Sequence, residues 1–118
     1  MSIVSSLFKK QMPGKGSSII LDCAAYKEAI ENKKVQLVDV RTPKEYSGGF
    51  IKDAVNIDFF QKKEFTEYFE GLERSQPVYL YCRSGQRSQK AATRLLSMGF
   101  EQIIDLKGGI LQWNKECN

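Results

Sequence analysis

The chain has 118 residues, of which 42% are apolar and 27% are charged, a balance typical of one compact folded domain. Its apolar runs are shorter than the roughly 20 residues that a membrane-spanning helix needs, so the composition favours neither a membrane protein nor a disordered chain. The net charge is +4, but the lysines stand in separate pairs. We therefore expect mild steering of small anions, with no nucleic-acid or membrane partner.

Residues 1–18 are predicted to form an N-terminal extension, flexible or amphipathic, ahead of a single domain over residues 19–118. The apolar patch at the start is too short for a secretion signal, and its lysines follow that patch instead of preceding it. We therefore expect a cytoplasmic protein.

Short β-rich runs alternate with longer helical patterns, which predicts an α/β domain with a parallel sheet of about five strands flanked by helices. The predicted strands are residues 19–21, 35–40, 54–57, 78–81 and 103–106. The predicted helices are residues 23–32, a short turn from 43, a segment within 59–72, residues 88–98, and a last turn or two from 110. Thr42, Pro43 and Glu45 have the order of a capping box with proline at the first helical position.

Three cysteines, Cys23, Cys82 and Cys117, occur in a chain that has no histidine. They form no CxxC pair and show no fourth metal ligand, so we expect neither a zinc site nor a disulfide framework, and a reducing compartment fits them better. Cys23 lies in a helical pattern and is predicted to be a core residue. Cys117 is predicted to be a passive thiol near the chain end; the alternative is that it resolves a persulfide on Cys82 as a disulfide.

The stretch YLYCRSGQRSQKAA, residues 79–92, places Cys82 after an almost wholly apolar strand and shortly before a helix. The residues that follow are charged, hydroxyl-bearing or small: Arg83, Ser84, Gly85, Gln86, Arg87 and Ser88. The carboxyl end of a parallel strand is where open α/β sheets bind ligands, and a helix N-terminus with consecutive N–H groups favours a thiolate. Because no histidine is available, activation of Cys82 must come from the loop itself.

A lone cysteine at a strand end is most often a small buried hydrophobe. The polar and charged residues beside Cys82 argue against that interpretation, because a structural core cysteine has no use for them. We therefore favour a nucleophilic role for Cys82.

The loop Cys82-Arg-Ser-Gly-Gln-Arg-Ser88 resembles the active-site loop of single-domain rhodaneses, the thiosulfate sulfurtransferases. Further motifs agree in order and spacing: Asp39-Val40-Arg41, Pro43 with Glu45-Tyr46, Gly49 to Ile57, Gly108-Gly109, and Trp113. The resemblance covers about residues 19–114. Phe50 and Asp53 stand where the family usually has a histidine and a glycine, so we expect altered packing or a changed rim with the chemistry kept.

The resemblance implies a two-step reaction in which the Cys82 thiolate takes the outer sulfur of thiosulfate, releases sulfite and holds the sulfur as a persulfide. Cyanide or a thiol acceptor then removes it. Arg83 and Arg87 are expected to bind the anionic donor, helped by the rest of the loop, and Arg87 alternatively holds the loop in place. No metal or organic cofactor is implied. Asp39 and Arg41 are expected either to orient the loop or to form an internal ion pair.

Two alternatives stay open. A persulfide carrier that serves a sulfur-relay partner in tRNA thiolation or cofactor synthesis would use the same loop. Cys-based phosphatases and arsenate reductases place five residues between cysteine and arginine, because a tetrahedral oxyanion needs a wider cradle. Here four residues separate Cys82 from Arg87, so we favour sulfur transfer over phosphate chemistry.

Overall fold

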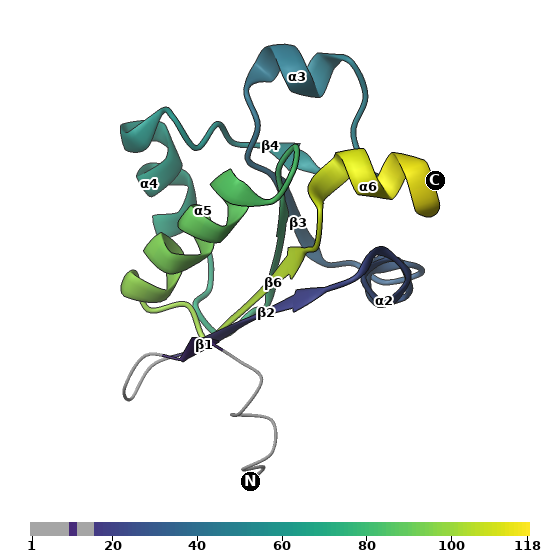
Figure 1. Cartoon of the computed structure of the whole chain (residues 1–118). Helices are drawn as coiled ribbons and strands as arrows, with labels where there is room; N and C mark the ends of the chain where they lie inside the picture. Colours follow the sequence, from purple (N-terminus) through teal and green to yellow (C-terminus); the bar gives the residue numbers. More distant parts are fainter. Residues whose placement is uncertain (1–9, 12–15) are drawn as a thin grey trace, which may run out of the picture.

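The computed structural model describes residues 10–11 and 16–118 as a sheet with helices on both faces (Figure 1). The strands are β1 (Lys10–Gln11), β2 (Ser17–Leu21), β3 (Gln36–Asp39), β4 (Val55–Asn56), β5 (Val78–Tyr81) and β6 (Gln102–Leu106). The helices are α2 (Cys23–Ile30), α3 (Pro43–Ser47), α4 (Lys62–Glu70), α5 (Gln86–Ser97) and α6 (Gly109–Glu116). Each predicted strand and helix is present, with ends shifted by one or a few residues.

The strands of the described residues lie in the order β1-β2-β6-β5-β3-β4. The five from β2 to β4 run parallel, which confirms the predicted parallel α/β sheet, and β1 adds an antiparallel pair at the edge. β5 is central, between β3 and β6. The residue that follows β5 therefore leaves the sheet at the carboxyl end of a strand with neighbours on both sides.

Two apolar cores fill the space between the sheet and its helices. On one face, α4 and α5 bury Phe65, Phe69 and Leu95 against the sheet. On the other face, α2 and α6 bury Tyr26 and Trp113 (Figure 1). A parallel sheet needs cover on both faces, and the near-continuous apolar runs of its strands follow from that requirement.

The strand ends explain most of the differences from the predicted bounds. Val40 lies beyond β3, yet its N–H donates to the Tyr81 carbonyl at 3.0 Å, and the N–H of Ile57, beyond β4, donates to the Asp39 carbonyl at 2.9 Å. The last residues of the predicted strands 35–40 and 54–57 therefore still bond to a neighbouring strand, although β3 and β4 end before them. Helix α5 begins at Gln86, two residues earlier than predicted, because Gly85 turns the chain with a φ of +110°.

The sheet reaches into the stretch predicted as an N-terminal extension, since β1 and the first two residues of β2 lie there. The division of the chain at residue 19 stays a prediction, and residues 1–9 and 12–15 lie outside the described residues. Among the helices between residues 16 and 118, none combines the length and the apolar character needed to cross a membrane.

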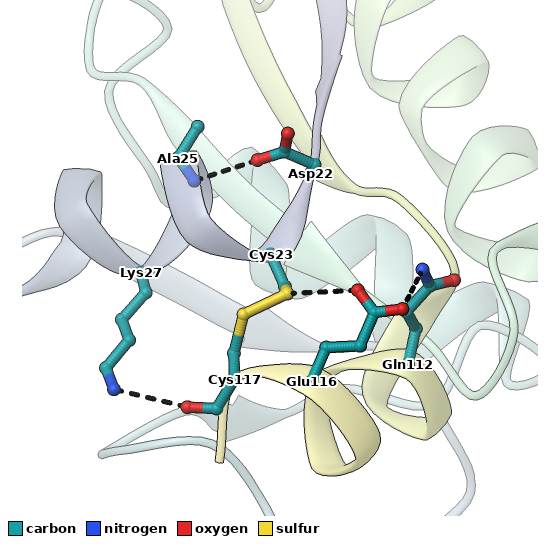
Figure 2. Close-up of a disulfide and its surroundings, with 7 residues drawn as sticks. All are labelled: Asp22, Cys23, Ala25, Lys27, Gln112, Glu116 and Cys117. Atoms are coloured by element: carbon teal, nitrogen blue, oxygen red, sulfur yellow. Dashed lines mark hydrogen bonds between the residues drawn. A yellow bond between two sulfur atoms is a disulfide. The ribbon is translucent and has the colours of Figure 1, made fainter.

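A disulfide joins Cys23 and Cys117, which are 94 residues apart in sequence (Figure 2). The prediction of no disulfide, with Cys117 as a free thiol, was therefore wrong. The physical reason is that α2 begins where α6 ends, on the same face of the sheet, so the two Cα atoms lie 6.1 Å apart. The prediction that Cys23 is a core residue was correct, because its side chain is buried. Cys82 is the free cysteine.

We expect Cys117→Ser to lower the free energy of unfolding of the oxidised protein by about 2–5 kcal/mol, because the disulfide closes a long loop of the unfolded chain. The measurement is denaturant unfolding of both proteins without reductant. A reductant should bring the wild type down to the stability of Cys117→Ser. Equal stability of the two proteins before reduction would contradict the expectation.

Candidate active site

Cys82 is the first residue after β5, and its side chain is 1% exposed. The chain bends through residues 83–85 and enters the twelve-residue helix α5 at Gln86, close to the end of β5 (Figure 1). The N–H of Gly85, the N-cap of this helix, lies beside the sulfur. This is the strand-end and helix-start arrangement that the sequence predicts for Cys82. The helix N-terminus carries a partial positive charge that stabilises an anion.

Two groups contact the sulfur directly. The backbone N–H of Gly85 lies 3.0 Å from Sγ, and the Oγ of Ser88 lies 3.4 Å from it. Ser88 is completely buried, and its hydroxyl donates to the Gly85 carbonyl at 3.3 Å. The Gly85 N–H is therefore a donor of the kind that a thiolate or an anionic persulfide needs, while Ser88 Oγ accepts the hydrogen bond of the thiol.

The guanidinium of Arg87 is bound to Glu45 of α3. Its Nη1 and Nη2 donate to Oε1 and Oε2 of Glu45, both at 2.8 Å, a bidentate geometry that fixes the guanidinium strongly. Glu45 is itself held by the capping box of α3, because its Oε1 accepts the N–H of Thr42 at 3.0 Å. The arrangement supports the predicted loop-holding role of Arg87.

The Glu45–Arg87 pair shifts the pKa values of both side chains. The hydrogen bonds from Arg87 lower the pKa of the Glu45 carboxyl to about 2, although burial acts in the opposite direction. The pKa of Arg87 is raised by the same partner. Both groups therefore stay charged at neutral pH.

Arg83, Ser84 and Gln86 are exposed around the loop. Arg83 lines an open cavity of about 610 Å³, whose wall also includes Phe50, Lys52 and Trp113. Phe50 is 46% exposed and stacks on Tyr46 with ring centroids 4.1 Å apart. It therefore forms part of the rim of this cavity, at the position where the sequence departs from the family pattern.

Asp39 and Arg41 form a buried ion pair, with Nη2 and Oδ2 2.6 Å apart. The second contact of Arg41 Nη2 is the Gly49 carbonyl, at 2.7 Å. Of the two predicted roles, the internal ion pair is the one that these contacts describe. The pair holds Gly49 in the wall of the cavity, and the Arg41 guanidinium lies 5.8 Å from the ring centroid of Tyr81, the residue before Cys82.

The N-terminus of α6 supports the loop from behind. Ile110 donates its N–H to the Cys82 carbonyl at 2.9 Å, and Leu111 donates to the Arg83 carbonyl at 3.1 Å. Gly109 has a φ of +64°, and a Cβ added there would overlap the carbonyl groups of Cys82 and Arg83. A glycine is therefore required for α6 to approach the loop so closely.

A family model for the rhodanese-like domain matches residues 22–116. The chain belongs to the rhodanese-like sulfurtransferase family. A sulfurtransferase of Allochromatium vinosum is 34% identical over 83 residues, which cover 70% of this chain and 75% of the relative. The crystal structure of a rhodanese-related protein from Thermoplasma volcanium matches with a TM-score of 0.70 and 32% identity, over 82% of this chain and 91% of that one.

Other relatives of this rhodanese-like domain are longer. A tRNA uridine(34) hydroxylase of Pelagibacter ubique is 33% identical over 108 residues, which cover 82% of this chain and 36% of the relative. The chain therefore spans about a third of the length of the hydroxylase relatives it matches.

Sequence reasoning missed three residues that the rhodanese-like fold brings to the site. Glu45 was assigned to a helix cap, and Gly109 only to a family motif. Asp105 is a buried carboxylate in β6, and its one sequence signal is a charge inside the apolar run Ile103-Ile104-Asp105-Leu106. Within the described residues, no group of three or more Cys, Asp or Glu side chains is gathered as metal ligands would be; independence from metals and cofactors stays a prediction.

Glu45→Gln should remove the part of the pH dependence of folding stability that comes from the Glu45–Arg87 pair. The pKa of Glu45 in the fold, about 2, lies below its ordinary value of 4.5, so the ion pair stabilises the fold above pH 4.5, and this stabilisation is lost as the pH falls toward 2. Denaturant unfolding at several pH values should show the wild type more stable than Glu45→Gln at neutral pH, with the gap closing in acid. The matched control is Glu28→Gln on the exposed surface of α2. A gap independent of pH would contradict the expectation.

Gly109→Ala should push α6 away from the cysteine loop. A non-glycine residue in a left-handed conformation costs about 1–3 kcal/mol, and the overlap with the loop carbonyls adds to that cost. We expect lower stability and a loss of most Cys82-dependent activity. Gly71→Ala is the control, because Gly71 has a φ of −83° and a Cβ there meets the Tyr68 carbonyl only at an ordinary 3.5 Å. Full activity of Gly109→Ala would show that the close contact is dispensable.

Proposed function

We propose that the protein is a sulfurtransferase that carries a sulfane sulfur as a persulfide on Cys82. The donor is thiosulfate or another persulfide, and the acceptor is cyanide or a thiol. The single observation that carries the proposal is the sulfur of Cys82 at the N-terminus of α5, 3.0 Å from the Gly85 N–H. This is a site for a sulfur anion that needs no histidine.

The reaction has two displacement steps. The Cys82 thiolate attacks the outer sulfur of thiosulfate, a new S–S bond forms, and the old S–S bond breaks with its electron pair leaving on sulfite. The terminal sulfur of the persulfide carries the negative charge, next to the Gly85 N–H and the N-terminus of α5. The acceptor then bonds to this terminal sulfur and regenerates the Cys82 thiolate.

The roles of the remaining loop residues follow from their exposure. Arg83 is exposed at the cavity and supplies charge for an anionic donor, with Ser84 and Gln86 beside it. Both guanidinium ends of Arg87 are bound to Glu45, so Arg87 acts on the donor mainly by fixing the loop. A phosphatase would need that guanidinium over the anion, which is a further reason to prefer sulfur over phosphate.

A second candidate function is a persulfide carrier that works with a partner protein. The observation in its favour is that the same domain forms part of longer relatives, among them proteins named tRNA uridine(34) hydroxylase. In a carrier, Cys82 would load fastest from a protein persulfide such as that of a cysteine desulfurase. Comparing loading by thiosulfate with loading by a desulfurase separates the two functions.

The proposed setting is the cytoplasm, with no nucleic-acid or membrane partner. A reducing compartment opens disulfides, so Cys23 and Cys117 would be present there as two free thiols. The proposed chemistry does not depend on that bond, because Cys82 is a separate free thiol.

Incubation with thiosulfate should add one sulfur atom to Cys82, and cyanide should remove it as thiocyanate. Intact-protein and peptide mass spectrometry measure both events. Cys82→Ser is expected to keep the fold and lose the added sulfur completely, because hydroxyl oxygen is not a comparable nucleophile at neutral pH. Sulfur found on another residue, or full transfer by Cys82→Ser, would overturn the proposal. Hydrolysis of phosphate esters in its place would favour the phosphatase alternative.

A further inference from the structure

Asp105 is a buried carboxyl group that none of the interactions described above uses. It is 2% exposed, and neither of its carboxylate oxygens has a hydrogen-bond partner among the described residues. A buried charge without a partner is costly, so natural proteins rarely keep one without a reason. Its position in the fold suggests that reason.

Asp105 lies directly behind the cysteine loop. In β6 it pairs in register with Leu80 of β5, two residues before Cys82. Side chains alternate along a strand, and Ile103, two residues earlier, belongs to the core under α5. Asp105 therefore faces α5, on the same side of the sheet as Cys82 and Ser88.

Ser88 stands between the carboxyl group and the sulfur. Its Oγ accepts the hydrogen bond of the Cys82 thiol over 3.4 Å, and its hydroxyl is the one side-chain group that lowers the pKa of Asp105, although the two groups are not within full hydrogen-bonding geometry. The proton of Ser88 is directed at the Gly85 carbonyl over 3.3 Å, a long and therefore weak bond. Turned toward Asp105, the hydroxyl would donate to the carboxylate while it still accepts the hydrogen bond of the thiol.

The carboxyl group is suited to exchange a proton near neutral pH. Burial raises its pKa to about 6, and the hydroxyl of Ser88 and the backbone of Leu106 offset only part of that rise. The titratable group that interacts electrostatically with it is the Tyr26 hydroxyl on α2, beyond the sheet. On α5, Arg87 is paired with Glu45. The neighbour in register on β2 is the apolar Ile20.

We propose that Asp105 is a positioning residue that orients the Ser88 hydroxyl and takes up, through it, the proton that Cys82 releases. The inference rests on the proposed nucleophilic role of Cys82. The S–H bond breaks and its proton passes to Ser88 Oγ, while the hydroxyl's own proton passes to an Asp105 oxygen. The negative charge moves from the carboxylate to Sγ, where the N-terminus of α5 and the Gly85 N–H stabilise it.

The experiment measures alkylation of Cys82 by iodoacetamide from about pH 5 to about pH 9, in unreduced protein so that Cys23 and Cys117 stay in their disulfide. Peptide mass spectrometry assigns the modified cysteine. The proteins compared are the wild type, Asp105→Asn, Ser88→Ala, Ser88→Thr and Glu101→Gln. Glu101→Gln is the matched control, because it removes one carboxylate from the exposed residue just before β6.

The wild type should show a rise in alkylation rate near pH 6, where Asp105 titrates. Asp105→Asn and Ser88→Ala should both lose this rise, with a fall of about a hundredfold at pH 7, the lower end of the range of general-base contributions. Ser88→Thr keeps the hydroxyl and should restore the profile, and Glu101→Gln should leave it unchanged. Circular dichroism tests whether each variant is folded. If Asp105→Asn does not fold, the two Ser88 variants still test the inference.

The opposite result is equally clear. If Asp105 were only a fixed negative charge, its removal would favour the thiolate and speed alkylation, since a like charge nearby disfavours ionisation. A faster or unchanged rate in Asp105→Asn, or a wild-type profile in Ser88→Ala, overturns the inference. Alkylation requires no sulfur donor, so its result does not depend on the persulfide test. The inference about Asp105 can therefore fail while the proposed function holds, and the reverse.

Discussion

The close approach of three backbone segments around Cys82 is the constraint on which the rest of the site depends. The end of β5, the start of α5 and the start of α6 meet there, joined by the bonds from Gly85 to the sulfur and from Ile110 to the Cys82 carbonyl. Gly85 and Gly109 make this possible, because both have positive φ and Gly109 has no room for a Cβ. The sulfur is therefore placed by backbone geometry, which side-chain motion disturbs little.

Support for the loop comes from distant parts of the chain. Glu45, on α3, holds Arg87 in a bidentate pair, and α6 holds the loop carbonyls from behind. The Cys23–Cys117 disulfide fixes the far end of α6 to α2 (Figure 2). The carbonyl of Cys117 also accepts a hydrogen bond from Lys27 of α2 at 3.2 Å. The bonds from α3 and from the start of α6 preorganise the loop, which favours catalysis by fixed dipoles. The disulfide adds a restraint on the far end of α6 in the oxidised protein.

The lack of histidine in the chain gives the buried polar groups unusual importance. Most activated cysteines are paired with a nearby base. In this fold a backbone N–H and a buried hydroxyl contact the sulfur, and the buried carboxyl group of Asp105 lies on the neighbouring strand β6. Keeping a carboxyl group inside the sheet lowers stability, and such a cost is typical of functional sites.

The type of fold and the start of one helix follow from the sequence alone. The alternation of apolar runs and helical patterns specified the parallel α/β sheet, and Thr42 with Glu45 specified the start of α3, because these signals act over a few residues. The sequence also placed Cys82 between a strand end and a helix start. Only the tertiary structure decided the partners: Glu45 for Arg87, Gly49 for Arg41 and Cys117 for Cys23. These pairs are 42, 8 and 94 residues apart, and packing of the elements, with no local signal, brings them together.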